Sequence, residues 1–401
     1  MEDFFPVILG STIIAYYMAR CFHQEYAIKP LVVGREQLGP VQHSEILDFR
    51  AEPTLWDRDA FADVLVGIGK EYADRYGKLL LIGTSDQYVR QIIECRDVLQ
   101  EYFTFNYMSM EQLDQITVKA NFYDLCRESG MDIPETVAYN VGGNEPVPTF
   151  GTFPRVIKPS DVDSYFRSTW TGQKKVYRAY SNEEVRDIVA LVRRNGYTGE
   201  LIIQDFIPGD DTFIYDAVFY ADKSGKCRFM SFAQVILQEH AASAVGSYTA
   251  LLTRFDQDYM DRLKEFVENF HYTGFGNADI KFDARDGTFK LFEINARQGR
   301  SSYYVTPCGF NLAKYLVDDL VYDTDKEFEY VRQPLLHKVV PFGIIRKYVS
   351  DPALKREARA LMRSGDWVDP FRYPKDLSAR RRIYLLLHAV NYYKKYRQET
   401  W

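Results

Sequence analysis

Cysteine is scarce in this chain of 401 residues, and its few cysteines are widely spaced. The five positions are Cys21, Cys95, Cys126, Cys227 and Cys308. Wide spacing argues against a zinc knuckle or a redox dithiol, and an odd number fits poorly with a framework of disulfide bonds. We therefore expect the protein to work in a reducing, cytoplasmic setting.

An excess of positive charge is also lacking. Lysine and arginine together number 50 against 56 for aspartate and glutamate, which gives a net charge of -6 at pH 7. Proteins that bind nucleic acids depend on clustered basic side chains that displace counterions from the phosphates. The composition therefore predicts no nucleic-acid partner and favours a small molecule or a peptide.

Long apolar runs are missing as well, apart from one segment near the start, Phe4–Phe22. Acidic residues precede this segment where a signal peptide has basic ones, and Gly10 and Arg20 interrupt it. A membrane-spanning helix needs about 20 predominantly apolar residues. We expect instead a buried strand, Phe5–Leu9, followed by a helix, Ile13–Tyr26, and no transmembrane segment.

What the first hundred residues do contain is an alternation of short β-rich runs with helical patterns. A second apolar strand, Lys78–Ile82, leads through the loop Gly83–Asp86 into a helix that begins at Gln87. This order predicts a Rossmann-like α/β domain with a parallel sheet. Ligands settle at the carboxyl ends of such strands, so this loop and the Gly10–Thr12 turn are candidate substrate sites. Either loop taken alone fits an ordinary strand-to-helix connection, and neither contains the GxGxxG of a dinucleotide site.

The rest of the chain changes character twice. Strands dominate after a loop rich in glycine, asparagine and proline, Asn140–Gly151, and the chain turns helical and rich in arginine and tyrosine after about residue 320. Helices are expected at Lys119–Ser129, Asn182–Arg194, Gln257–Phe270 and Ile383–Arg397. We expect an N-terminal domain at 1–112, an α+β domain at 113–320 with subdomains 113–205 and 206–320, and a helical basic region at 321–401.

The most informative stretch is NADIKFDARDGTFKLFEINARQGR, residues Asn277–Arg300. Alternate residues of a strand share a face, so the polar positions of each predicted strand point the same way. A turn at Asp286 and Gly287 predicts a hairpin with Arg285–Gly287 as its loop. These positions place Asp279 opposite Glu293, with Lys281 on the face of Asp279 and with Asn295 and Arg297 on the face of Glu293.

Two adjacent carboxylates repel each other unless a cation neutralises them. Carboxylate and amide oxygens suit Mg²⁺ rather than zinc, so we predict a magnesium site at Asp279, Glu293 and Asn295. Fixed positive charge beside it would stabilise a phosphoryl or acyl-phosphate group. The candidate catalytic residues are therefore Arg297, Arg300 and Lys281. A solvated hairpin is the alternative, which the apolar Ile294 between Glu293 and Asn295 disfavours.

Two upstream segments have features of a nucleotide site. Lys158 ends an apolar strand, where a lysine can reach phosphates as a point charge. The apolar strand that begins at Leu201 ends in a break that would free backbone groups of Phe206 and Ile207 for an adenine edge, and Asp211 could accept from ribose hydroxyls. Taken singly, each feature also fits a surface lysine or an ordinary strand end.

Taken in order, these residues resemble the ATP-grasp superfamily, which implies two α+β subdomains that clamp ATP beside a Rossmann-like domain. The resemblance assigns the phosphates to Lys119 and Lys158, the adenine side to Gln204, Asp205, Phe206 and Ile207, the ribose to Asp211, and Mg²⁺, expected as two ions, to Asp279, Glu293 and Asn295. The sequence departs from the family in two places. The loop after Lys158 holds a single glycine, Gly172, where many members have a glycine-rich lid, and Gln204 stands where many have glutamate.

Four segments further resemble the bacterial D-aspartate ligase branch, over roughly residues 5 to 320. They are PVILGSTIIAYYMARCFHQEY, LLLIGTSDQY, KANFYDLCRESGMDIPET and EINARQGRSSYYVT. The resemblance implies an ADP-forming carboxylate–amine ligase that activates D-aspartate, or a similar amino acid, as an acyl phosphate. Its acceptor would be an amine of a peptidoglycan precursor. The alternatives are a ligase of another amino acid or peptide, an ATP-dependent phosphotransferase, and a nucleotide-sensing module without activity.

Two features remain open at the level of sequence. His240 is a candidate general base, although a lone histidine is more often structural. The C-terminal region is basic, with Arg380, Arg381, Arg382, Lys394, Lys395 and Arg397 among tyrosines. These side chains fit a solvated helix face, or they would hold an anionic partner such as a nucleotide-linked precursor or an anionic membrane surface, through peripheral contact.

Overall fold

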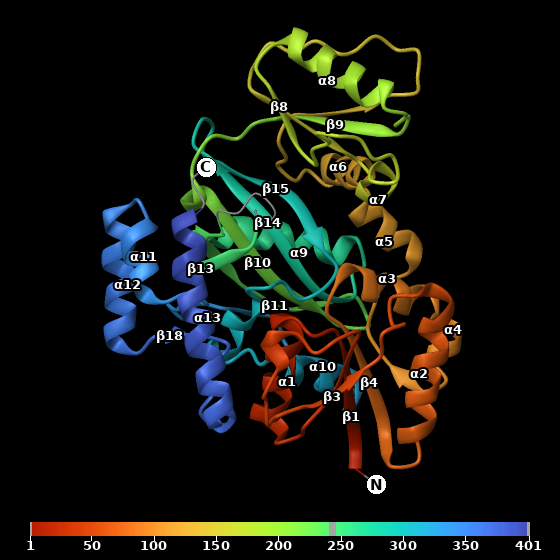
Figure 1. Ribbon diagram of the computed structural model, residues 1–401, viewed down its shortest axis with the longest axis vertical. Helices are drawn as coiled ribbons and strands as arrows, with labels where there is room; N and C mark the ends of the chain where they lie inside the picture. Colours follow the sequence, from red (N-terminus) through yellow and green to blue (C-terminus); the bar gives the residue numbers. More distant parts are fainter. Residues whose placement is uncertain (1, 240–245, 399–401) are drawn as a thin grey trace. The chain divides into compact units, whose positions relative to one another are not determined.

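The computed structural model describes residues 2–239 and 246–398 and is drawn in Figure 1. The chain forms two compact units, which we describe separately. Unit 1 comprises Met1–Met110, Ile214–Asn277 and Asn295–Trp401, and unit 2 comprises Glu111–Phe213 and Ala278–Ile294. Both units are therefore assembled from segments that are discontinuous in sequence.

A parallel sheet forms the N-terminal part of unit 1, in the strand order β3-β2-β1-β4-β5. Its strands are β1 (Glu2–Leu9), β2 (Leu31–Gly34), β3 (Asp48–Ala51), β4 (Tyr76–Gly83) and β5 (Phe103–Thr104). The helices beside it are α1 (Ile13–Tyr26), α2 (Arg58–Tyr72), α3 (Asp86–Glu94) and α4 (Arg96–Leu99). The expected parallel sheet with flanking helices is confirmed.

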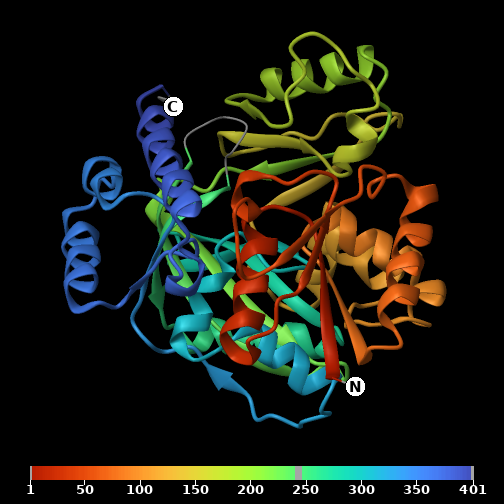
Figure 2. The ribbon, with the colours of Figure 1, turned by 60° about the horizontal axis from the view of Figure 1, so that its bottom comes forward.

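Alternation along β1 explains how helices come to cover both faces of this sheet. Phe4 and Ile8 pack in one apolar cluster with α1, whereas Phe5, Val7 and Leu9 pack in another with α2. Figures 1 and 2 show α1 on one side of the strands and α2 on the other. The apolar segment at the start of the chain is thus a buried strand followed by a buried helix, as expected.

A second, mixed sheet forms the remainder of unit 1. Its strands follow the order β14-β10-β12-β13-β17-β18, and β11 pairs with β10 and with β16. The bounds are β10 (Ile214–Ala221), β11 (Cys227–Met230), β12 (Phe232–Gln238), β13 (Tyr248–Arg254), β14 (Gly274–Asp283), β16 (Glu329–Tyr330), β17 (Leu336–Lys338) and β18 (Trp367–Val368). The helices of this part are α9 (Gln257–Asn269), α10 (Leu312–Leu320), α11 (Phe342–Tyr348), α12 (Pro352–Ser364) and α13 (Ala379–Gln398), with short 3-10 turns at Gly39–Val41, Ser302–Cys308 and Pro374–Asp376.

Unit 2 is an antiparallel α+β unit with the strand order β6-β9-β7-β8. Its elements are α5 (Met110–Thr117), α6 (Lys119–Glu128), β6 (Thr136–Asn140), β7 (Arg155–Pro159), α7 (Val162–Tyr165), β8 (Tyr177–Ala179), α8 (Asn182–Arg194), β9 (Glu200–Asp205) and a 3-10 turn at Asp211–Phe213. Helix α8 shows why these residues fold as they do: Ser181 caps it, and Val185, Val189 and Val192 bury one face.

The hairpin of β14 and β15 (Thr288–Asn295) contributes to unit 2 the segment Ala278–Ile294, which carries Asp279 and Glu293, two of the three predicted metal ligands. Its loop is Ala284–Gly287, one residue longer than expected from the sequence. The chain turns earlier because the Asp283 carbonyl accepts from the Gly287 amide at 2.8 Å and the Asp283 side chain accepts from the Arg285 amide at 3.0 Å. Gly287 has a φ of 74°, in the left-handed region that favours glycine.

Within residues 2–239 and 246–398, none of the helices combines the length and the apolar composition needed to cross a bilayer.

Candidate active site

In unit 2 a carboxylate lies between two lysines. Glu293, on β15, accepts a hydrogen bond from the Lys119 Nζ at 3.0 Å, and Lys119 is the first residue of α6. The attraction of Lys119 is the main reason that the pKa of Glu293 falls to about 2, and Lys158 and a hydrogen bond with Asp279 add to it. Glu293 is therefore ionised at any physiological pH, and the Asp279 carboxyl lies within hydrogen-bonding reach of it.

Lys158, on β7, is held by neutral groups. Its Nζ donates to the Tyr123 hydroxyl at 3.2 Å and to the Gln204 Oε1 at 3.1 Å. Burial, with the charge of Lys119 as the next cause, lowers the pKa of Lys158 to about 7. Neutral acceptors position an ammonium group without cancelling its charge. An incoming polyanion would therefore restore the protonated form.

Gln204 and Asp205 end β9, and both side chains are engaged within unit 2. The Gln204 amide, which is 2% exposed, donates to the Thr136 hydroxyl at 2.8 Å while its oxygen accepts from Lys158. The Asp205 carboxylate pairs with the Arg285 guanidinium at 2.6 Å. The first arrangement links the adenine-side candidate directly to a phosphate-side lysine.

The break after β9 holds the remaining adenine and ribose candidates. The Phe206 amide donates to the Pro154 carbonyl at 3.2 Å, so the expectation that the break frees this N–H is wrong: pairing with the start of β7 continues for one more residue. Ile207 is buried, and Asp211 is half-buried at the start of a 3-10 turn. Lys281 donates to the Gly209 carbonyl at 3.1 Å and lies over the Phe206 ring, which ties β14 to this loop.

In unit 1 the segment that follows β15 makes its own set of contacts. The Arg297 guanidinium donates to the Asp86 carboxylate at 3.0 Å and to the Asn295 Oδ1 at 3.2 Å. The Asn295 amide in turn donates to the Asn277 carbonyl at 3.3 Å. Arg297 therefore joins two sequence-predicted regions, the polar end of β15 and the Gly83–Asp86 loop.

Arg300 has partners that the sequence did not indicate. Its guanidinium donates to the Glu239 carboxylate at 2.8 Å and to the Tyr392 hydroxyl at 3.0 Å. Glu239 is 4% exposed and also accepts from Lys395 at 3.2 Å. These partners are 61 and 92 residues away from Arg300 in sequence. No local pattern marks such distant pairs, which is why sequence reasoning missed them.

The two candidate substrate loops of unit 1 lie side by side. They leave the neighbouring parallel strands β1 and β4, where Leu9 is paired with Gly83. The Thr84 hydroxyl donates to the Leu9 carbonyl at 2.6 Å, and a Cβ at Gly10, whose φ is 120°, would lie 2.3 Å from that hydroxyl oxygen. Only glycine at position 10 allows the two loops to approach so closely.

The donors of the hairpin fit a hard divalent cation. Asp279 and Glu293 are adjacent carboxylates, and Asn295 follows Glu293 by two positions on β15 and so shares its face. Among the residues that the structure describes, there is no cluster of three or more histidine, cysteine, aspartate or glutamate side chains able to hold a metal ion. A site here therefore depends on the Asn295 amide and on substrate oxygens as well as on the two carboxylates.

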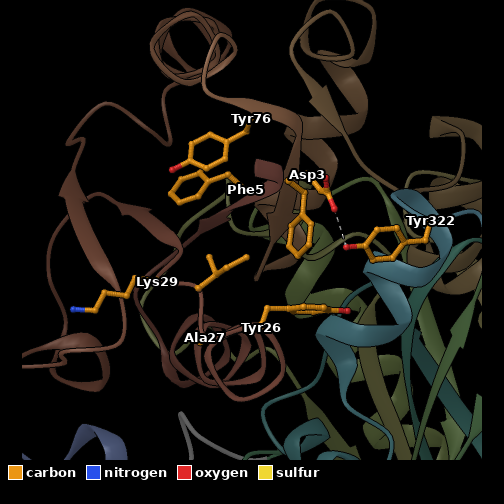
Figure 3. A pocket seen from close by; sticks show the side chains of 9 residues that line it. Asp3, Phe5, Tyr26, Ala27, Lys29, Tyr76 and Tyr322 are labelled. Atoms are coloured by element: carbon orange, nitrogen blue, oxygen red, sulfur yellow. Dashed lines mark hydrogen bonds between the residues drawn. The ribbon is translucent and has the colours of Figure 1, made fainter. Parts of the chain in front are cut away.

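A cavity of about 590 Å³ lies elsewhere in unit 1, at the amino ends of β1 and β4 (Figure 3). The Tyr322 hydroxyl donates to the Asp3 carboxylate at 3.4 Å, and the Phe5 and Tyr76 rings stack at 4.6 Å. None of the described residues predicted to bind ATP or metal is among those lining it. His240, the candidate base, lies outside the described residues.

Known proteins resemble this chain in sequence and in fold. A D-aspartate ligase of Enterococcus faecium (strain Aus0004) is 31% identical over 408 residues, which cover 98% of this chain and 97% of that protein. No protein-family model matches the chain.

Similarity to solved structures concerns the fold alone. An L-amino acid ligase from Bacillus licheniformis has a TM-score of 0.57 at 12% identity, over 80% of this chain and 75% of that chain. The N5-carboxyaminoimidazole synthetase of Staphylococcus aureus complexed with ADP has a TM-score of 0.59 at 11% identity, over 88% and 87% of the two chains. These structures have the ATP-grasp fold. Identity of this extent over nearly the whole chain, together with the shared fold, shows that the protein belongs to the D-aspartate ligase family of ATP-grasp carboxylate–amine ligases.

Proposed function

We propose that this protein joins a carboxylate of D-aspartate, or of a similar amino acid, to an amine of a peptidoglycan precursor, with conversion of ATP to ADP and phosphate. The observation that carries the proposal is the cluster of Lys119, Lys158 and Glu293 with the neighbouring Asp279. It combines two cations for a polyphosphate with paired carboxylates for a divalent cation. The similarity to a D-aspartate ligase over 98% of the chain supports the choice of amino acid.

In this proposal the cluster offsets the negative charge of ATP so that the substrate carboxylate, which is also an anion, can approach the phosphates. Lys119 and Lys158 would contact the phosphates, and Asp279, Glu293 and Asn295 would hold Mg²⁺, proposed as two ions. When bound, Mg²⁺ offsets the charge of the phosphate oxygens and orients them for an in-line attack. Gln204, Asp205, Phe206 and Ile207 form the adenine side, with the Phe206 carbonyl rather than its amide available to the base, and Asp211 accepts from the ribose.

The reaction then takes two steps. A substrate carboxylate oxygen attacks the γ-phosphorus of ATP, the bond to ADP breaks, and an acyl phosphate forms. The acceptor amine attacks the carbonyl carbon, phosphate leaves with the bonding electrons, and the amine loses a proton to the medium or to a base. Arg297, Arg300 and Lys281 are proposed to stabilise the negative charge that develops on the acyl group and its phosphate.

A panel of amino acids tests the proposal. D- and L-aspartate, D- and L-glutamate and neutral amino acids are each incubated with Mg²⁺-ATP, with and without a lysine-containing peptidoglycan precursor, and phosphate release is measured. We expect release that requires both D-aspartate and the amine. Release with another amino acid would redirect the substrate assignment, and no release with any pair would contradict a ligase of this kind.

Hydroxylamine distinguishes ligation from phosphotransfer on the same fold. An acyl phosphate reacts with hydroxylamine to give a hydroxamate, whereas a stable phosphoester does not. We expect hydroxamate formation in the absence of the acceptor amine. ADP release without any hydroxamate would favour a phosphotransferase, and ATP binding without ADP release would favour a nucleotide-sensing module.

A further inference from the structure

The helix α13 is held firmly to unit 1 by one of its faces. Arg381, which is fully buried, donates to the carbonyls of Pro40 and Gln42, both at 2.7 Å, and lies over the Tyr16 ring. The Tyr396 hydroxyl donates to the Gln238 carbonyl at 2.7 Å. Contacts at both ends of the helix therefore fix which face it presents outward.

The opposite face of α13 is an exposed apolar row. Its members are between 41% and 65% exposed and recur at helical spacing: Ile383, Leu386, Leu387, Val390 and Tyr393. Exposed apolar residues that stand alone need no explanation, but a contiguous row on one helix face marks a surface that is covered by something. Because the inner face is already packed, this row is not left over from an incomplete core.

Basic side chains border the row, and acidic ones are missing from the helix. The sequence of α13, ARRRIYLLLHAVNYYKKYRQ, contains no aspartate or glutamate, in a chain whose net charge is -6. Arg380, Arg382, Lys394 and Arg397 are exposed beside the row. The neighbouring helix α11 adds Arg346 and Lys347, which line a hollow of about 440 Å³ together with Tyr393 and Arg397. Charge and apolar surface thus coincide on one side of unit 1.

We propose that this face of α13 docks on an anionic lipid surface, with the apolar row in the acyl boundary and the basic border on the headgroups. A helix that presents an apolar face flanked by lysine and arginine is the kind that lies in the plane of a membrane interface. A second copy of the chain fits less well. A two-fold contact through the same face would set the two basic borders against each other, and like charges repel.

Vesicle sedimentation of the full-length protein tests the proposal. The probes are vesicles of phosphatidylcholine alone and of phosphatidylcholine mixed with phosphatidylglycerol. We expect the protein to sediment with the anionic vesicles and to remain in solution with the zwitterionic ones. Leu386→Glu combined with Val390→Glu should bring sedimentation to the level without vesicles. The matched control is Val98→Glu combined with Val176→Glu, which adds the same two charges at apolar side chains that are 47% and 49% exposed.

Charge is tested separately from apolar contact. Arg380→Gln, Lys394→Gln and Arg397→Gln together should weaken binding about a hundredfold, since each basic residue near an anionic surface contributes about fivefold. The control with the same change in net charge replaces the exposed Lys70, Arg186 and Arg194 by glutamine. Added salt should weaken binding of wild type and of the control, and affect the charge variant less.

Three outcomes would overturn the proposal. One is equal sedimentation with anionic and zwitterionic vesicles, and another is wild-type binding by the Leu386→Glu, Val390→Glu variant. The third is a combination of two results: wild type does not bind vesicles, and it self-associates, as measured by sedimentation velocity, in a way that the same variant abolishes. Thermal unfolding of each variant confirms that it is folded. Because binding is measured without ATP or amino acids, failure here is distinct from failure of the proposed ligase activity.

Discussion

Two acidic side chains of this protein, Asp216 and Glu293, lie in opposite surroundings. The first has a structural role, and the second belongs to the candidate active site. Asp216, in the core of unit 1, is fully buried and accepts from Asn277, Ser301 and Tyr304 at 3.0, 2.7 and 3.2 Å. All three donors are neutral, and burial raises the pKa of Asp216 to about 6. Glu293, in unit 2, faces two lysines, and its pKa falls to about 2.

The two sites differ in whether hydrogen bonds alone satisfy the carboxylate or charged groups surround it. The hydrogen bonds of Asp216 satisfy both of its oxygens, so the network is complete and has a structural role. Around Glu293 and Asp279, charges of both signs are concentrated in a half-buried setting, which is the kind of environment found at sites that bind and transform charged ligands. Here the charged partners around Glu293, and not a perturbed pKa alone, distinguish the candidate site from the structural network around Asp216.

The largest effect is expected at Glu293. Glu293→Gln removes the charge from the proposed metal ligand and should lower the rate of ADP release on the order of 10³-fold, with little change in the melting temperature, because the side chain is 42% exposed. Steady-state kinetics with D-aspartate and the acceptor amine measure it. Glu183→Gln, on the exposed face of α8, is the control. Full turnover by Glu293→Gln would remove this residue from the mechanism.

A smaller effect, on stability, is expected at Asp216. Its folded pKa lies above the unfolded value of 3.8, so folding favours the protonated form. The contribution of Asp216 to the free energy of unfolding is then highest below about pH 4 and declines as the pH rises to about 6, by about 3 kcal/mol in total. Asp216→Asn should lack this decline. The measurement is the difference in unfolding free energy between wild type and variant at pH 4.5 and pH 7.5, and an unchanged difference would contradict the assignment.

A change of about tenfold per pH unit is expected for nucleotide affinity. Lys158 has a pKa of about 7 without ligand, and phosphates favour its protonated form, so affinity for ADP should fall as the pH rises from 7.5 to 8.5. Calorimetry at each pH measures it. Lys158→Met should bind more weakly at pH 7.5 and lose the pH dependence. If the variant retained the wild-type slope, another group would be responsible.

The smallest effect is expected at an exposed ion pair. Arg297 and Asp86 are 3.0 Å apart, but the Asp86 side chain is 59% exposed, so solvent screens the pair. Asp86→Asn should change the unfolding free energy by less than about 1 kcal/mol, and high salt should remove the change. Asp59→Asn is the control, because Asp59 lies in the first turn of α2 as Asp86 does in α3. A salt-insensitive loss of several kcal/mol would show that this pair resembles a buried one.

Sequence patterns predicted the bounds of a helix well where a capping residue and a regular spacing of apolar residues both lie within the helix segment. Ile13–Tyr26 and Asn182–Arg194 were expected with the bounds that the structure has, because Thr12 and Ser181 cap them and apolar positions recur along them. The last helix begins at Ala379 rather than at Ile383. Ser378 caps it there, accepting from the Arg381 amide, and the three arginines that follow hid the start of the helix.

Side-chain partners far apart in sequence could not be predicted. Asp205 was expected beside adenine, and no sequence pattern indicated its pairing with Arg285, which is 80 residues away. Arg300 was expected beside the acyl phosphate, and its contacts with Glu239 and Tyr392 depend on how β12 and α13 pack within unit 1. By contrast, the alternation of side chains along the two strands of the hairpin did predict that Asp279 and Glu293 are adjacent, because this pattern depends only on residues close together in sequence.

The order of segments in unit 2 bears on how the chain is made. A ribosome synthesises Lys119 and Lys158 with the segment Glu111–Phe213, but Ala278–Ile294, which carries Glu293, emerges only after Ile214–Asn277 of unit 1. A nascent chain arrested before residue 278 lacks the strand segments of Ala278–Ile294 and with them Glu293, the partner of Lys119. Maturation of unit 2 must therefore wait for late synthesis, and fragments that end upstream of the hairpin should remain loosely folded.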